Sequence, residues 1–142
     1  MNHSAFDRTF VTLATVAVAA GVIAGFWVLG TPSQQRLIKS DQQRLADLTA
    51  IANTLHLYWQ SQDQEEYVLP DILNPDDQRQ DPITQEPYDY SKVDENLYQL
   101  CANFATDSST YKLANANNEN WQHPEGFYCF KLEISQQPPS LY

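Results

Sequence analysis

The sequence FVTLATVAVAAGVIAGFWVL occupies residues 10–29 and contains no charged side chain. A 20-residue α-helix is about 30 Å long, which matches the hydrocarbon core of a bilayer. No other stretch of the 142-residue chain stays hydrophobic for as long. We therefore predict a transmembrane helix over residues 10–29. An N-terminal tail over residues 1–9 precedes it, and the part of the chain that follows it is predicted to be soluble.

A cleaved signal peptide is the alternative for this N-terminus. Its charged leader would have to lie before Phe10, and small side chains do follow. The apolar run is longer than the usual core of a signal peptide, and the one cation, Arg8, is offset by Asp7. These features favour an uncleaved signal anchor.

Two glycines lie one helical turn apart within the apolar run. Gly21 and Gly25 form the sequence GVIAG, and small residues at this spacing let two membrane helices approach closely. The alternative is ordinary membrane-helix composition. The pair is a candidate helix-packing surface.

A helix break follows the span. Pro32 suits the first position of a new helix, Thr31 suits its N-cap, and Gln34 lies where a capping box closes. Alternatively, one helix continues with a bend at Pro32. In either case residues 30–44 are polar and predict a solvated helical stalk, and the helix extends to about Gln62.

The second half of this helix is amphipathic. Apolar residues recur there at intervals of three and four, which predicts a stripe that lies against a sheet: Leu45, Leu48, Ile51, Ala52, Leu55, Tyr58 and Trp59. His56 is expected to be a packing residue, because no second metal ligand lies at helical spacing from it.

Two strands are predicted after a proline-rich acidic loop. Residues 96–104 alternate, with Tyr98, Leu100, Ala102 and Phe104 on one face and Cys101 on the other. Residues 126–134, GFYCFKLEI, form the clearest strand. The predicted fold class is α+β, with a transmembrane helix continuing into a long amphipathic helix packed on a small antiparallel sheet. Residues 45–135 are the soluble domain, and residues 136–142 are expected to be a flexible tail.

Two short motifs resemble those of a known superfamily. Leu69-Pro70 follows the long helix, and the segment from Asp81-Pro82 to Pro87-Tyr88-x-Tyr90 leads into the predicted sheet. With the order of elements, these motifs resemble the type IV pilin-like superfamily, particularly the pseudopilins of type II secretion systems. The resemblance implies a pilin-like domain outside the cytoplasm with a structural or interaction role.

The chain departs from that superfamily at its N-terminus. The superfamily has a glycine at a peptidase cut and a glutamate shortly after, which takes part in fibre assembly. Here no glycine precedes Phe6 or Phe10, and residues 14–29 contain no acid. We expect the N-terminus to be retained and the protein not to form fibres by itself.

Charge counts do not settle the orientation. Arg8 and the N-terminal amine precede the span, whereas Arg36, Lys39 and Arg44 follow it, so the positive-inside rule places the C-terminal side in the cytoplasm. The resemblance places the domain outside, and we adopt that orientation.

The chain has two cysteines, Cys101 and Cys129, both in predicted strands. In a small exported domain an even number of cysteines favours a disulfide. Two buried thiols are the alternative and would suit a cytoplasmic domain.

Acidic side chains gather after the long helix, at Asp63, Glu65, Glu66, Asp71, Asp76, Asp77 and Asp81. The resemblance makes calcium worth considering, but no EF-hand pattern is present. We expect a solvated acidic surface without a metal, and tolerance of the loss of any one acid from Asp71 to Asp81.

No residue set points to catalysis. His123, Glu125 and Cys129 do not match a zinc spacing, and no hydrolase, metalloprotease or nucleotide-binding motif occurs. After the span the chain has seven Lys or Arg against 17 Asp or Glu, which disfavours nucleic-acid binding. We expect no enzyme activity, cofactor or small-molecule substrate.

The expected function is that of a single-pass membrane protein whose extracytoplasmic domain contacts envelope proteins. One alternative is an accessory subunit of a multisubunit membrane complex. Another is a membrane-tethered enzyme that uses Cys101 and Cys129, which lacks a CxxC motif and a base.

Overall fold

The computed structural model of the chain describes residues 3–29, 31–62, 67–110 and 118–141. It divides into two compact units, Met1–Arg36 and Leu37–Tyr142. The first contains the N-terminal helix, and the second contains a domain built from a helix and a sheet.

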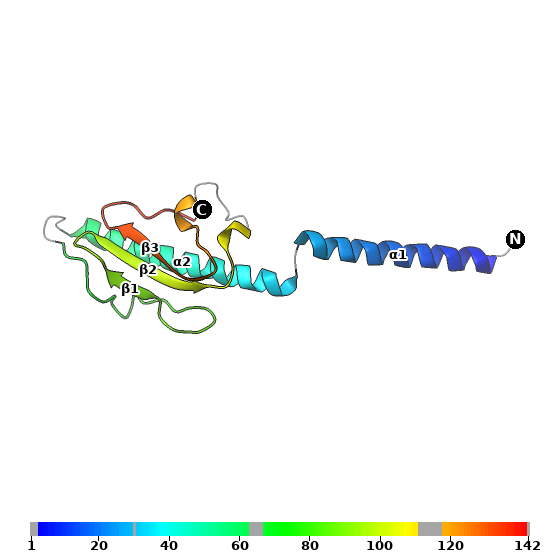
Figure 1. Cartoon of the computed structure of the whole chain (residues 1–142), viewed down its shortest axis with the longest axis horizontal. Coiled ribbons are helices and arrows are strands. Elements are labelled where there is room, and N and C mark those ends of the chain that lie inside the picture. The colour runs from blue at the N-terminus through cyan, green and yellow to red at the C-terminus, as the bar shows by residue number, and fades with distance from the viewer. Residues whose placement is uncertain (1–2, 30, 63–66, 111–117, 142) are drawn as a thin grey trace. The chain divides into compact units, whose positions relative to one another are not determined.

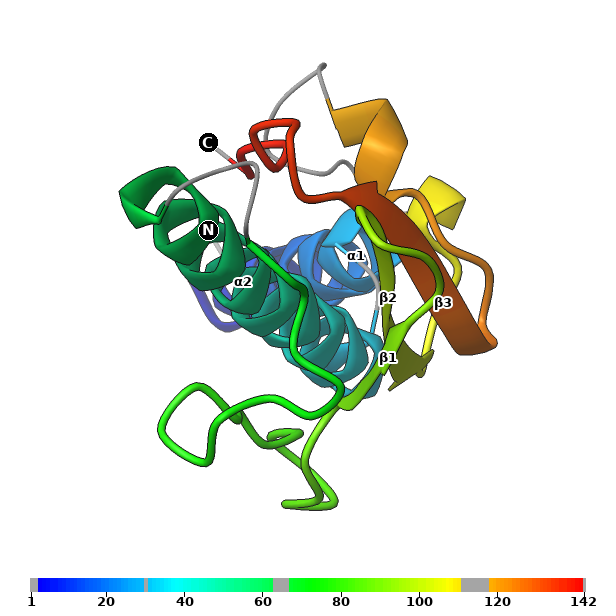
Figure 2. The same ribbon diagram turned by 90° about the vertical axis from the view of Figure 1, so that its left-hand side faces the viewer.

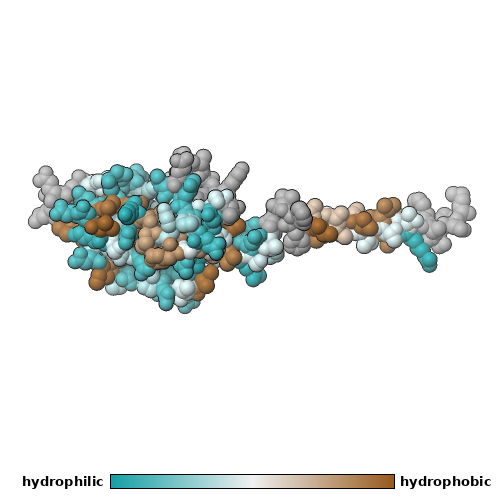
Figure 3. All heavy atoms as spheres, in the orientation of Figure 1, coloured by the Kyte–Doolittle hydropathy of each residue, from teal (hydrophilic) through white to brown (hydrophobic). Residues whose placement is uncertain are grey.

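Helix α1 runs from His3 to Leu29 (Figure 1). Its large apolar side chains face outward, and Phe10, Leu13 and Val18 are 65–67% exposed. Figure 3 shows hydrophobic and neutral residues along its visible face, whereas the domain surface is mostly hydrophilic. In the part of the chain that the structure describes, α1 is the one helix long and apolar enough to cross a membrane, over the window Arg8–Gly25.

A capping box separates α1 from helix α2, which runs from Pro32 to Ser61. The backbone N–H of Gln34 donates to Thr31 Oγ1, and the Thr31 N–H donates to Gln34 Oε1, both at 3.4 Å. This reciprocal pair satisfies backbone donors that the first helical turn leaves open. Of the two alternatives from the sequence, the structure therefore has a new helix starting at Pro32.

The sheet has three antiparallel strands in the order β1-β2-β3. These are β1 (Asp89–Lys92), β2 (Leu97–Phe104) and β3 (Gly126–Glu133). Helix α2 lies along one face of this sheet (Figure 2). The sequence prediction is confirmed for the two longer strands and for the α+β class. Strand β1 was not predicted as a strand.

One hydrophobic cluster forms the core of the domain. It joins the apolar stripe of α2 to the even-numbered side chains of β2, to Phe130 of β3 and to residues of the segments around the strands. Its members are Leu45, Leu48, Ile51, Ala52, Leu55, Leu69, Leu73, Tyr88, Tyr98, Leu100, Ala102, Phe104, Trp121, Phe130 and Ile134. The alternation of β2 predicted which of its faces is buried, because successive strand side chains point to opposite faces.

Only part of the stalk expected over residues 30–44 is solvated. Asp41 is fully buried and Arg44 is 4% exposed. Both lie on the same helical stripe as Leu45 and Leu48, at intervals of three and four. The buried part of α2 therefore begins earlier than the apolar residues alone predicted.

The C-terminal segment also differs from the free tail expected over residues 136–142. Pro138 is buried, and Trp121 Nε1 donates a hydrogen bond to the Pro139 carbonyl at 2.8 Å. Leu141 packs against the core cluster. The fully buried indole of Trp121 needs an acceptor, and the returning chain supplies one.

Candidate functional site

A buried network of charged side chains joins α2 to the loop before β1. The guanidinium of Arg44 donates from Nε to Asp81 Oδ2 at 2.5 Å and from Nη2 to Asp81 Oδ1 at 3.1 Å. It also donates from Nη1 to Asp41 Oδ1 at 2.7 Å. The exposed fractions of the Arg44, Asp41 and Asp81 side chains are 5%, 0% and 9%. Such charges are stable when buried only if they are paired and hydrogen-bonded, as these are.

Asp41 extends the network to the end of β2. Its Oδ1 accepts the Ala105 backbone N–H at 2.9 Å, and its Oδ2 accepts the Thr106 N–H at 2.8 Å and the Thr106 hydroxyl at 2.6 Å. With Arg44 this makes four donors to one carboxylate. Asp41 thus fixes the point at which the chain leaves the sheet.

A third carboxylate, Asp47, lies two turns further along α2. It accepts hydrogen bonds from Gln43, Arg79 and the Tyr88 hydroxyl, each at 3.1 Å. Burial, and then the negative charge of Asp47, raise the pKa of Tyr88 well above its usual value. Tyr88 therefore stays protonated and acts as a donor.

Asp81 also organises its own loop. Its Oδ1 accepts the backbone N–H groups of Ile83 at 2.8 Å and Thr84 at 3.0 Å. Burial alone would raise the pKa of Asp81. The hydrogen bonds from Arg44, Thr84 and Ile83 outweigh burial and hold that pKa below its ordinary value. The Asp-Pro motif is therefore a turn whose side chain is clamped to the helix.

The chemistry of this network is that of a structural clamp. Each of its three carboxylates accepts several hydrogen bonds from protein groups. The expectation of a solvated acidic surface is wrong for Asp81, which is 7% exposed and paired with Arg44, so its loss is no longer expected to be tolerated. The sequence carried one signal for this clamp, since Asp41 and Arg44 fall on the apolar stripe of α2.

Within the described ranges no group of three or more His, Cys, Asp or Glu side chains is arranged to hold a metal ion. Asp63, Glu65 and Glu66 lie outside the described residues. Asp71 and Asp76 are exposed, as expected from the sequence.

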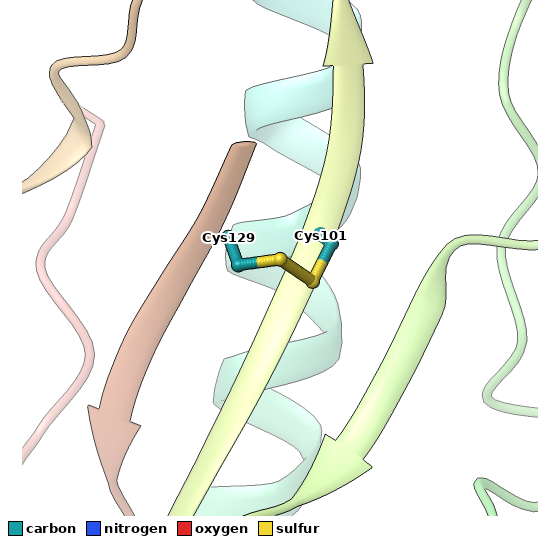
Figure 4. Close-up of a disulfide and its surroundings, with 2 residues drawn as sticks. All are labelled: Cys101 and Cys129. Carbon is teal, nitrogen blue, oxygen red and sulfur yellow. A yellow bond between two sulfur atoms is a disulfide. The ribbon is translucent and has the colours of Figure 1, made fainter. Parts of the chain in front are cut away.

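A disulfide joins Cys101 on β2 to Cys129 on β3. The two residues are direct cross-strand partners with a Cα–Cα distance of 4.0 Å. Figure 4 shows the bond on the face of the sheet away from α2. The predicted pairing is confirmed, and neither Cys101 nor Cys129 is a free thiol.

A hollow of about 270 Å³ lies beside the disulfide. Its lining includes Cys101 and Phe127 from the sheet, and Glu86 and Asp89 from the loop and β1. Phe127 is 63% exposed. Acidic side chains and the exposed ring of Phe127 therefore meet at this hollow.

Both histidines of the domain are structural. His56 Nδ1 is 2.8 Å from the Ile134 carbonyl. His123 is 3% exposed and stacks on Phe104 with ring centroids 3.6 Å apart. Burial lowers the pKa of His123. His56 has the packing role expected from the sequence.

The glycine pair on α1 is open. A Cβ atom added at Gly21 or Gly25 would meet no atom within 4 Å. The two positions are one turn apart on an exposed helix, which leaves room for another helix to approach.

Comparison of the chain with known protein families, with characterised proteins and with solved structures returned no match. The resemblance to pilin-like proteins therefore rests on the short motifs and the order of elements alone.

Proposed function

We propose that the chain is a single-pass membrane protein whose domain lies outside the cytoplasm and serves a structural or interaction role in the cell envelope. The proposal rests on the observation that one chain contains both an exposed apolar helix and a disulfide-bonded domain. Disulfides persist in oxidising compartments. The pilin-like resemblance of the Leu-Pro and Asp-Pro motifs agrees with this assignment.

The interior of the domain supports an interaction role over an enzymatic one. Three of the buried ionisable groups of α2 hold the loop and the end of β2 in place: Asp41, Arg44 and Asp47. A scaffold rigidified in this way suits the display of a surface. A membrane-tethered enzyme using Cys101 and Cys129 has no observation in its favour.

A second candidate is an accessory subunit of a multisubunit membrane complex. The open backbone at Gly21 and Gly25 favours this alternative, because close helix–helix contact in a membrane uses such positions. Under this proposal a larger membrane protein holds α1.

Extraction in mild detergent followed by native mass measurement tests the proposal. An interaction protein gives a species heavier than the 16.2 kDa chain that contains another envelope protein. A lone protomer in every detergent would contradict the interaction role. Replacing Gly21 and Gly25 by Ile separates the candidates, because only the accessory-subunit alternative needs those positions for the complex.

A further inference from the structure

Among the residues that the structure describes, strand β3 lies at an edge of the sheet and pairs with β2 alone. It pairs with β2 without a bulge, from Leu97↔Glu133 to Phe104↔Gly126. An edge strand presents a row of backbone donors and acceptors to which another strand can add. Which groups β3 presents follows from its register with β2.

The backbone groups of the odd-numbered residues point away from β2. The Ile134 N–H donates to the Asn96 carbonyl at 3.0 Å, so these two residues form a hydrogen-bonded pair. Every second pair of the ladder, counted from this one, is hydrogen-bonded as well. These alternate with non-hydrogen-bonded pairs, which are closer. The 4.0 Å Cα–Cα distance between Cys101 and Cys129 fits the closer kind. The N–H groups of Phe127, Cys129 and Lys131 therefore face the open edge.

These three amides have no hydrogen-bond partner within the part of the chain that the structure describes. The side chains of Phe127 and Lys131 are exposed, and that of Cys129 is half-buried. The strand contains no proline, so the edge is not blocked from within.

The side chains of β3 indicate the chemistry of what would cover this edge. On the face toward α2, Tyr128 and Leu132 are only half-buried, although Phe130 between them is 5% exposed. On the opposite face, Lys131 and Glu133 are exposed. A complementary strand has apolar side chains opposite Tyr128 and Leu132, an acid opposite Lys131 and a base opposite Glu133.

We propose that β3 is a docking edge to which an extended segment of a different envelope protein adds as a fourth strand. The inference rests on the interaction role proposed above and names its surface. Main-chain hydrogen bonds supply affinity in this mode of recognition, and alternate side chains supply specificity.

A second copy of the chain fits this edge less well. Two copies paired antiparallel through β3 are related by a two-fold axis perpendicular to the sheet, so their α2 helices run in opposite directions. The apolar helix precedes α2 directly in the sequence, so the two anchored ends of α2 would lie at opposite ends of the pair. That arrangement does not suit two chains held in one membrane.

Substitution of Lys131 tests the edge directly. Lys131→Pro removes an N–H that faces the open edge and removes no hydrogen bond to β2, and proline is tolerated at such positions. Lys131→Ala is the matched control, since it removes the charge and keeps the N–H. Both variants are made in the full chain, extracted from membranes in mild detergent and weighed by native mass measurement.

Wild type and Lys131→Ala are expected to carry the partner, and Lys131→Pro is expected to lose at least nine-tenths of it. An unchanged complex in Lys131→Pro would overturn the docking edge and leave the proposed function standing. A complex of two identical chains would also overturn it. A lone wild-type protomer would instead remove the proposed function.

If Lys131→Pro fails to form its disulfide, amide hydrogen exchange of the wild-type protein tests the docking edge instead. Exchange at Phe127, Cys129 and Lys131 is measured in the extracted complex and again after the partner has been dissociated. Exchange is expected to be at least tenfold slower in the complex. Equal rates in the two states would overturn the docking edge.

Discussion

Arg44 and Asp81 form a two-point ion pair that spans 37 residues of sequence, with Nε–Oδ2 and Nη2–Oδ1 distances of 2.5 and 3.1 Å. It fastens the loop before β1 to the middle of the chain's longest helix. Asp81 at the same time closes the turn that contains Pro82. A short Asp-Pro motif thus determines both the local turn and where the loop attaches.

The substitution Asp81→Asn is expected to destabilise the domain by about 3 kcal/mol, because it leaves a buried guanidinium with one of its two carboxylate partners. Chemical denaturation of the detergent-solubilised protein, followed by tryptophan fluorescence, measures the change. Asp76→Asn is the matched control in the same loop. Asp76 is exposed, so this variant should lie within about 0.5 kcal/mol of wild type. Equal stability of the two variants would show that the ion pair between Arg44 and Asp81 does not stabilise the domain.

The contribution of Asp81 should disappear in acid. Its folded-state pKa is depressed below the ordinary value of 3.8. The ion pair therefore stabilises the fold fully above about pH 4, and this stability is lost as the pH falls through the folded pKa. The difference in unfolding free energy between wild type and Asp81→Asn should be constant from pH 7 to pH 5 and shrink below pH 4. A difference that grows on acidification would have the wrong sign for this ion pair.

The sequence predicted those elements whose signals are local. Strands β2 and β3 alternate with period two, and the stripe of α2 repeats at three and four, so a short window of residues suffices for each. Strand β1 has four residues, DYSK, next to a proline-rich loop, and so it gave no window long enough to show alternation.

The clamp could not be predicted because its partners are distant in the sequence. Asp81 and Arg44 meet only when the loop folds back on α2. An acid on an apolar stripe, such as Asp41, shows that a polar group is buried but does not say which donor it meets. The disulfide was predictable because the chain has two cysteines and therefore one possible pairing.

Removing the disulfide should weaken the domain without changing its sheet. Replacing Cys101 and Cys129 by Ala opens a loop whose ends are 28 residues apart, at a cost of about 3.5 kcal/mol in the chain-entropy model. The measurement is the denaturation midpoint of the double variant against oxidised wild type. Two free thiols in protein isolated without reductant, detected by intact mass, would contradict the disulfide itself.

We expect no peptidase cut directly before the span or within it. No glycine precedes Phe6 or Phe10, and the span has no acid of the kind that pilin-like assembly uses. N-terminal sequencing of protein recovered from membranes tests this expectation. A new terminus at Phe6 or Phe10 would show that a peptidase processes the chain before the span. A terminus beyond residue 20 would exclude a permanent anchor.

Labelling of two engineered cysteines tests the membrane topology most directly. Ile72 is 76% exposed on the domain, and Asn2 precedes the span, so Ile72→Cys and Asn2→Cys report on its two sides. Right-side-out sealed vesicles are treated with a membrane-impermeant maleimide before and after permeabilisation. Ile72→Cys is expected to be labelled immediately, and Asn2→Cys only after permeabilisation. The reverse pattern would place the domain in the cytoplasm, and immediate labelling at both sites would show that α1 does not span the membrane.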